Sequence, residues 1–177
     1  MVVGPLLLLL AACVSGPTIT THASPDTDFS SFGTYNFMQP LDTDRPNGVQ
    51  TPLSTMLINS MSREMASKGL EQSNRPDLLV NFFANTEDRL DVRTVPATTG
   101  VHGFRHGRYA GWAGYRTTVR EYTRGTLNVD LVDAASNTLV WEGVAEGRLR
   151  EDVREITQEQ IDDVLGQVMA EFMKSKD

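Results

Sequence analysis

The sequence has few of the residues from which catalytic and metal-binding sites are commonly built. It contains three histidines and one cysteine in 177 residues, so an intramolecular disulfide is excluded. No apolar run approaches the roughly 20 residues that a membrane-spanning helix needs. Acidic residues outnumber basic ones, 23 to 16, and the net charge is −7. This balance excludes a general nucleic-acid binder, because the phosphate backbone would repel the chain.

The rest of the composition is that of a globular protein. Charged residues make up 22% and hydrophobic residues 40%, values typical of a folded chain rather than a disordered one. The length predicts one domain, and a domain of about 150 residues buries about 70% of the surface of its unfolded chain. Neither a disulfide nor a metal ion is therefore needed to stabilise the fold.

Charge is unevenly distributed along the chain. Between Glu87 and Arg124 there are seven arginines and four acidic residues, so this segment carries +3 and the remainder −10. The sequence therefore predicts an acidic body with a basic middle segment.

The N-terminus resembles a bacterial lipoprotein signal. Residues 1–12 are apolar and uncharged, and their length suits the apolar region of a secretory signal. Residues 10–13 (Leu-Ala-Ala-Cys) resemble a lipobox, which implies cleavage before Cys13 and acylation of its thiol. No Lys or Arg precedes Cys13, so either the start lies upstream or the signal is atypical. The alternative is an apolar N-terminal strand buried in the domain, with a free cysteine.

These features divide the chain into three parts. We expect a signal peptide at 1–12, a lipidated cysteine with a tether at 13–28, and a single domain at 29–177. The residue after the cysteine is Val14 rather than Asp, which by resemblance to enterobacterial lipoproteins favours the outer membrane. We therefore expect the cell envelope of a Gram-negative bacterium, with the domain facing the periplasm.

Hydrophobic periodicity predicts the strands of the domain. Alternation with a period of two indicates strands at 34–38 and 77–86. It also indicates a hairpin formed by residues 126–133 and 139–147.

Two amphipathic helices complete the domain. The first is predicted at 52–68, with Gly69 as its stop, and the second begins where Thr157 and Gln160 form a capping box. Their apolar stripes need a sheet face to cover. We therefore predict an α+β fold: a four-stranded, mostly antiparallel sheet with two helices packed on one face. A long insertion rich in Gly, Arg and aromatic residues precedes the hairpin.

Several segments resemble the DUF4136 family of bacterial lipoproteins. They are residues 28–35 (DFSSFGTY), 76–80 (PDLLV), 122–134 (YTRGTLNVDLVDA) and 139–145 (LVWEGVA). The resemblance covers roughly residues 25–175. It implies a domain of unknown function on an envelope lipoprotein, and it supplies no catalytic residue.

Residues 88–124 contain a candidate binding surface. Glycines, arginines and aromatic residues are interspersed there without clear periodicity. Such long segments without regular structure are usually functional or disordered. Arg and aromatic side chains are enriched at interfaces, and Arg binds phosphate and carboxylate groups bidentately. The alternative is a solvated hairpin extension whose glycines keep it flexible. The candidate binding surface consists of Arg105, Arg108, Tyr109, Trp112, Tyr115 and Arg116.

Reactive motifs are poorly supported. His102 and His106 have the spacing of metal ligands on a helix, but Gly103 and Gly107 disfavour a helix. The glycines lack the Lys-Ser/Thr end of a phosphate-binding loop, and no Gly-x-Ser-x-Gly motif supports a Ser-His-Asp triad. The carboxylates available for acid–base chemistry on the predicted hairpin are Asp130, Glu142 and Glu146.

The sequence thus predicts a non-enzymatic envelope lipoprotein without a cofactor or metal. Acyl chains on Cys13 hold it on a membrane, since two chains give stable anchoring. Its expected partners are an anionic envelope lipid, peptidoglycan or another envelope protein. Two alternatives are a structural accessory subunit of an envelope assembly or transport complex, and a hydrolase of envelope polymers.

Overall fold

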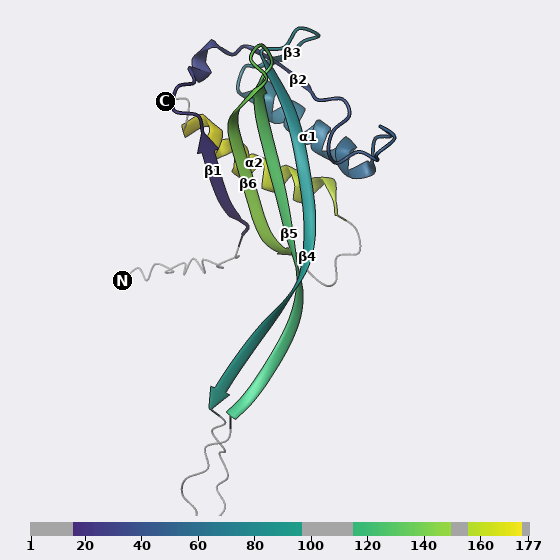
Figure 1. Cartoon of the computed structure of the whole chain (residues 1–177), viewed down its shortest axis with the longest axis vertical. Coiled ribbons are helices and arrows are strands. Elements are labelled where there is room, and N and C mark those ends of the chain that lie inside the picture. Colours follow the sequence, from purple (N-terminus) through teal and green to yellow (C-terminus); the bar gives the residue numbers. More distant parts are fainter. Residues whose placement is uncertain (1–15, 97–114, 150–155, 175–177) are drawn as a thin grey trace, which may run out of the picture.

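The computed structural model describes residues 16–96, 115–149 and 156–174, without the side chains at 95, 96, 115, 116, 173 and 174. They form an α+β fold in which two helices cover one face of a six-stranded sheet (Figure 1). The strands are β1 (Thr18–Ala23), β2 (Thr34–Phe37), β3 (Glu71–Gln72), β4 (Leu78–Pro96), β5 (Tyr115–Asp133) and β6 (Thr138–Leu149). The helices are α1 (Pro52–Ser67), α2 (Gln158–Lys174) and the short 3-10 helix η1 (Phe29–Ser31).

The sheet is mixed, with the strand order β1-β6-β5-β4-β2-β3. Strand β2 runs parallel to both β3 and β4, whereas the pairs β1–β6, β6–β5 and β5–β4 are antiparallel. The α+β class with two helices is therefore confirmed, but the prediction of four strands is wrong. The additional strands are β1 and β3, and β3 is a two-residue, exposed strand too short to leave a periodic pattern in the sequence.

Strand β1 comes from the segment that we expected to be part of a tether. It pairs with β6 from Thr18 opposite Glu146 to Ala23 opposite Trp141. Its first four residues are Thr or Ile, whose β-branched side chains favour strands, and Ile19 packs against the core. Because the segment is an edge strand rich in threonine, its composition resembles that of a linker.

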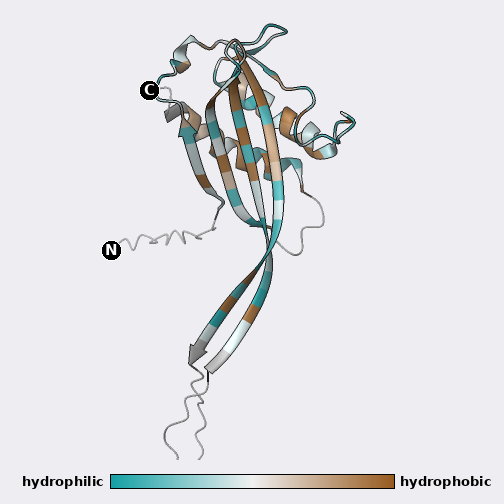
Figure 2. Cartoon of the chain, in the orientation of Figure 1, coloured by the Kyte–Doolittle hydropathy of each residue, from teal (hydrophilic) through white to brown (hydrophobic). Residues whose placement is uncertain are grey.

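The hydrophobic core lies between the helices and one face of the central strands. Apolar residues alternate with polar ones along these strands, as the hydropathy colouring shows (Figure 2). The fully buried side chains from the sheet are Leu78, Val80, Phe82, Val129, Leu131 and Trp141. Those from the helices are Leu57, Met61, Met65, Leu165, Val168, Met169 and Phe172.

The predicted helix ends are confirmed. Gly69 follows α1 with a φ of +77°, and the second helix begins with the expected capping box. The Thr157 amide donates to Oε1 of Gln160 at 3.0 Å, and the Gln160 amide donates to Oγ1 of Thr157 at 3.3 Å. Neither helix in the described ranges combines the length and apolar character needed to span a bilayer.

Strands β4 and β5 continue beyond the sheet as a two-stranded arm, residues 88–96 and 115–123 (Figure 1). Pairing runs unbroken from Asp88–Thr123 to Pro96–Tyr115, and β6 ends at Leu149, opposite Thr123. At about 3.3 Å per residue, the arm is about 30 Å long. Both ends of the predicted irregular insertion are therefore strand.

Candidate functional site

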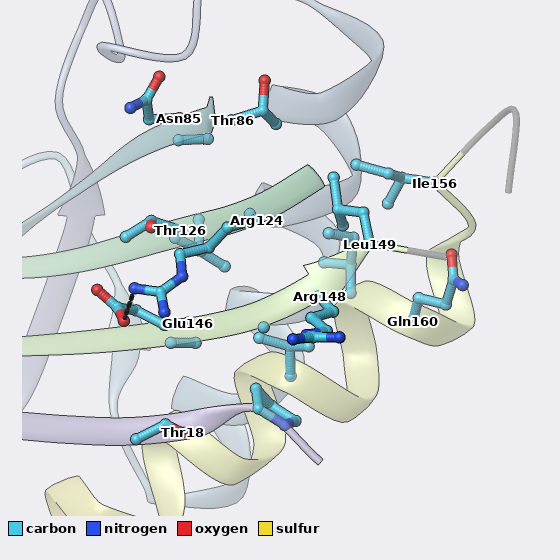
Figure 3. A pocket seen from close by; sticks show the side chains of 18 of the residues that line it. Thr18, Asn85, Thr86, Arg124, Thr126, Glu146, Arg148, Leu149, Ile156 and Gln160 are labelled. Carbon is cyan, nitrogen blue, oxygen red and sulfur yellow. Dashed lines mark hydrogen bonds and ion pairs between the residues drawn. The ribbon is translucent and has the colours of Figure 1, made fainter. Parts of the chain in front are cut away.

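A hollow lies between the sheet and the first turns of α2, at the end of the sheet from which the arm departs (Figure 3). Its volume is about 820 Å³, within the range of small-molecule binding sites. Small residues of the central strands form its floor: Ala84, Gly125, Ala145 and Gly147. Apolar side chains form its walls: Leu53, Leu127, Leu149, Ile156, Ile161 and Val164.

The hollow results from a change in side-chain size along the strands. On β4, the helix-covered face carries Val80 and Phe82 and then Ala84. On β6, the same face carries Trp141 and then Ala145 and Gly147. The helices are in contact with the large residues, and the small residues leave space beside α2. The arrangement can hold an apolar group without any rearrangement of the sheet.

The charged neighbours of the floor residues along β5 and β6 point to the opposite face of the sheet, where they contact one another or an aromatic ring. Arg124 Nη1 lies 3.2 Å from Oε2 of Glu146, as Figure 3 shows, and both side chains are partly exposed. The guanidinium carbon of Arg148 lies 3.8 Å from the centre of the Tyr122 ring. Exposed ion pairs contribute little to stability, so these contacts mainly orient the side chains. Among the described residues that line the hollow there is no Cys, Ser, His or Lys.

A row of polar residues crosses the open face, which is the sheet face opposite the helices. Register places His22, Glu142, Asp130 and Asn81 side by side on β1, β6, β5 and β4. Asn81 Nδ2 donates to Oδ2 of Asp42 at 2.6 Å. Burial raises the pKa of Asp130 above its ordinary value, and the negative charges of Glu142 and Asp42 raise it further.

Two of the three predicted carboxylates are thus brought together. Asp130 and Glu142 are direct cross-strand neighbours, whereas Glu146 lies further toward the arm and pairs with Arg124. Glu142 accepts a hydrogen bond from Nδ2 of Asn128 at 3.1 Å. In the described part of the chain, no group of three or more His, Cys, Asp or Glu side chains is arranged to hold a metal ion.

The raised pKa of Asp130 predicts a stabilising substitution. Because the pKa of Asp130 is raised in the folded state, the stability that its protonated form contributes is fully present below the unfolded-state pKa of about 3.9. This contribution is lost as pH rises through the folded-state pKa. Asp130→Asn removes the charge and supplies an amide donor for neighbouring carboxylates. We expect it to raise the free energy of unfolding by about 1 kcal/mol at pH 7.5, the typical net value of one hydrogen bond.

Urea denaturation at pH 7.5 and pH 3.5 measures this effect. The gain is expected to disappear at pH 3.5, because Asp130 is then neutral in the wild type as well. The exposed Asp26→Asn serves as the control for loss of one negative charge. An equal gain at both pH values would show that the charge of Asp130 is not the cause.

The residues expected to form the binding surface are only partly within the described chain. Cys13, Arg105, Arg108, Tyr109 and Trp112 lie outside the described residues. Tyr115 and Arg116 begin β5, opposite Pro96 and Val95, and only their backbone is described.

The sequence predicts neither the hollow nor the apolar side chains of the arm. The floor of the hollow is made of glycine and alanine, which give no periodic signal. In the arm, the only alternation visible in the sequence is the short stretch Leu90-Asp91-Val92-Arg93.

Comparison with solved structures shows the fold. A PDZ domain protein from Parabacteroides distasonis is similar over 87% of this chain, with a TM-score of 0.57 and 16% identity. The match spans only 35% of that protein, so the chain corresponds to about a third of its length. A dodecameric PelC variant from Paraburkholderia phytofirmans matches with a TM-score of 0.47 and 11% identity, over 87% of this chain and 95% of that one.

The comparison with curated proteins gives no match. The family model described as "Domain of unknown function (DUF4136)" matches residues 19–172. This range begins in β1 and ends in α2, so it includes every strand of the sheet and both long helices. The chain therefore belongs to the DUF4136 family, as its sequence motifs indicated.

Proposed function

We propose that this protein is a non-enzymatic lipoprotein of the Gram-negative cell envelope, held on the outer membrane by acyl chains on Cys13. The observation that carries the proposal is the lipobox-like sequence Leu-Ala-Ala-Cys at residues 10–13. Strand β1 supports it, because the sheet begins at Thr18, five residues after the cysteine. The domain is therefore joined to the proposed anchor by a short tether.

The domain serves as an interaction module in this proposal. The hollow offers an apolar cavity of about 820 Å³, and the arm offers an extended surface at the same end of the sheet. Both suit binding rather than acid–base chemistry. The arginines and aromatic residues between positions 105 and 116 are the proposed contacts to an anionic envelope lipid, peptidoglycan or another envelope protein.

Metabolic labelling with radioactive palmitate, followed by membrane fractionation, tests the proposal. In an enterobacterial host, the wild-type protein is expected to take up label and to fractionate with the outer membrane. Cys13→Ser removes the only sulfhydryl group in the chain and is expected to abolish labelling and release the protein into the soluble fraction. Labelling that persists in Cys13→Ser, or an unlabelled wild type, contradicts the proposal.

A matched variant separates acylation from sorting. Val14→Asp places an acidic residue directly after the cysteine, which resembles the inner-membrane sorting signal of enterobacterial lipoproteins. We expect this variant to be labelled as strongly as the wild type but to fractionate with the inner membrane. Unchanged outer-membrane fractionation would refute the sorting part of the proposal and leave acylation standing.

A further inference from the structure

The arm exposes an apolar face that the domain does not cover. Leu90 and Val92 lie two residues apart on β4, and Val119 lies directly opposite Val92 on β5, so all three side chains share one face. Their exposed fractions are 66%, 59% and 57%, the largest of any large apolar side chain in the described chain. Exposed apolar clusters of this kind mark sites of interaction.

The opposite face of the arm is polar, and several of its charged side chains form ion pairs. Arg93 Nε and Arg148 Nη2 each lie 3.4 Å from Oδ2 of Asp91. Arg89 Nη2 lies 2.7 Å from Oε2 of Glu87. The arm therefore carries an apolar cluster on one face, beside the carboxylates of Asp88 and Glu121, and mainly charged side chains on the other face. A two-stranded ribbon is only marginally stable alone in water, so burial of its apolar side chains against another surface would stabilise it.

The position of β1 places this ribbon close to the proposed anchor. Thr18 is opposite Glu146 of β6, which in turn is opposite Thr126 of β5. The arm begins three residue pairs further along, at Thr123. The chain thus enters the sheet at the end from which the arm departs (Figure 1).

Lengths decide what the arm can reach. The five residues from Cys13 to Thr18 span at most roughly 18 Å. The arm extends about 30 Å from the same end of the sheet. An anchored domain therefore holds the arm within reach of the lipid surface. Neither strand edge of the arm pairs with another strand of the described chain, so the arm fits the headgroup region, where water satisfies the backbone, and not the hydrocarbon interior.

We infer that the apolar face of the arm, formed by Leu90, Val92 and Val119, lies on the surface of the bilayer that holds the Cys13 acyl chains. The opposite face, which carries Arg89, Asp91 and Arg93, points to water, as the polar face does in amphipathic helices that lie in the plane of a membrane. The inference rests on the proposed acylation of Cys13. It goes beyond that proposal by assigning the lipid-contacting surface and the orientation of the domain.

Spin labels on neighbouring residues test the inference. The acylated full-length protein is reconstituted into vesicles of phosphatidylethanolamine and phosphatidylglycerol at a 3:1 ratio. Val119→Cys carries a nitroxide on the apolar face, and Thr118→Cys carries one on the polar face of the same strand. Val49→Cys, on the exposed loop before α1, gives the reference for water. Collision rates are measured with oxygen, which concentrates in lipid, and with a water-soluble nickel complex.

The oxygen-to-nickel ratio is expected to be several-fold higher at position 119 than at positions 118 and 49. Equal ratios at all three positions overturn the inference. Spin–spin broadening at position 119 that disappears on dilution with unlabelled protein also overturns it, because a second copy then covers the face. If the nitroxide reagent reacts with the wild-type protein, the Cys13 thiol is free. That result refutes the proposed function itself and is distinct from either failure of the inference.

Discussion

Replacing Trp141 with alanine is expected to lower the free energy of unfolding by about 3–5 kcal/mol, the range measured for large aromatic residues in protein cores. Trp141 is fully buried on β6. Its ring meets that of Phe172 of α2 edge-to-face, with the centroids 5.3 Å apart. The substitution therefore leaves a cavity between the sheet and the helix. Urea denaturation at pH 7, followed by circular dichroism, measures the change.

Trp141→Phe is the matched control for this cavity. The indole N–H of Trp141 has no hydrogen-bond acceptor among the described residues, so its removal breaks no bond between them. Phenylalanine keeps most of the buried ring, and we expect less than half of the loss seen with alanine. Equal losses for the two variants, or an alanine variant that loses under about 1 kcal/mol, would show that the indole does not fill the core as described.

Gly143→Ala is expected to destabilise the protein by about 1–3 kcal/mol, because this position has no room for a methyl group. A Cβ atom on Gly143 would lie 2.4 Å from Cη2 of Trp141 and 2.6 Å from Cγ1 of Val168. Gly147→Ala, on the same face of the same strand, is the control. Its Cβ atom would meet Pro17 at 3.6 Å, an ordinary contact, so we expect a change within about 0.5 kcal/mol.

The two core substitutions are expected to interact. In the double variant Trp141→Ala with Gly143→Ala, the new methyl group occupies part of the cavity that the indole leaves. Its loss of stability should therefore be smaller than the sum of the single losses by about 1 kcal/mol or more, as expected for residues in contact. Strict additivity in urea denaturation would contradict the close approach of Trp141 to Gly143.

Local chemistry made the helices and the central hairpin predictable from the sequence. The capping box at Thr157, the glycine stop at Gly69 and the alternation along residues 126–133 each act within a few residues, so they leave a readable pattern. Strand β1 and the arm depend instead on pairing with distant strands. A threonine-rich segment such as residues 18–23 becomes an edge strand because β6 is available to pair with it.

The candidate site was less predictable than the fold. The hollow arises because α2 does not close over small residues of three separate strands, and no single segment of the sequence contains that information. The pairing of Asp130 with Glu142 was easier to predict, since both residues lie on the predicted hairpin. Its register is shifted by an irregularity between Leu131 and Val132, which alternation alone does not reveal.

The proposed function and the inferred orientation of the arm both depend on the membrane anchor at Cys13. The most direct test is the intact mass of the protein extracted from its native membrane. We expect a chain that begins at Cys13 and carries the additional mass of a diacylglycerol unit. A protein that retains Met1 and has an unmodified thiol at position 13 would contradict it.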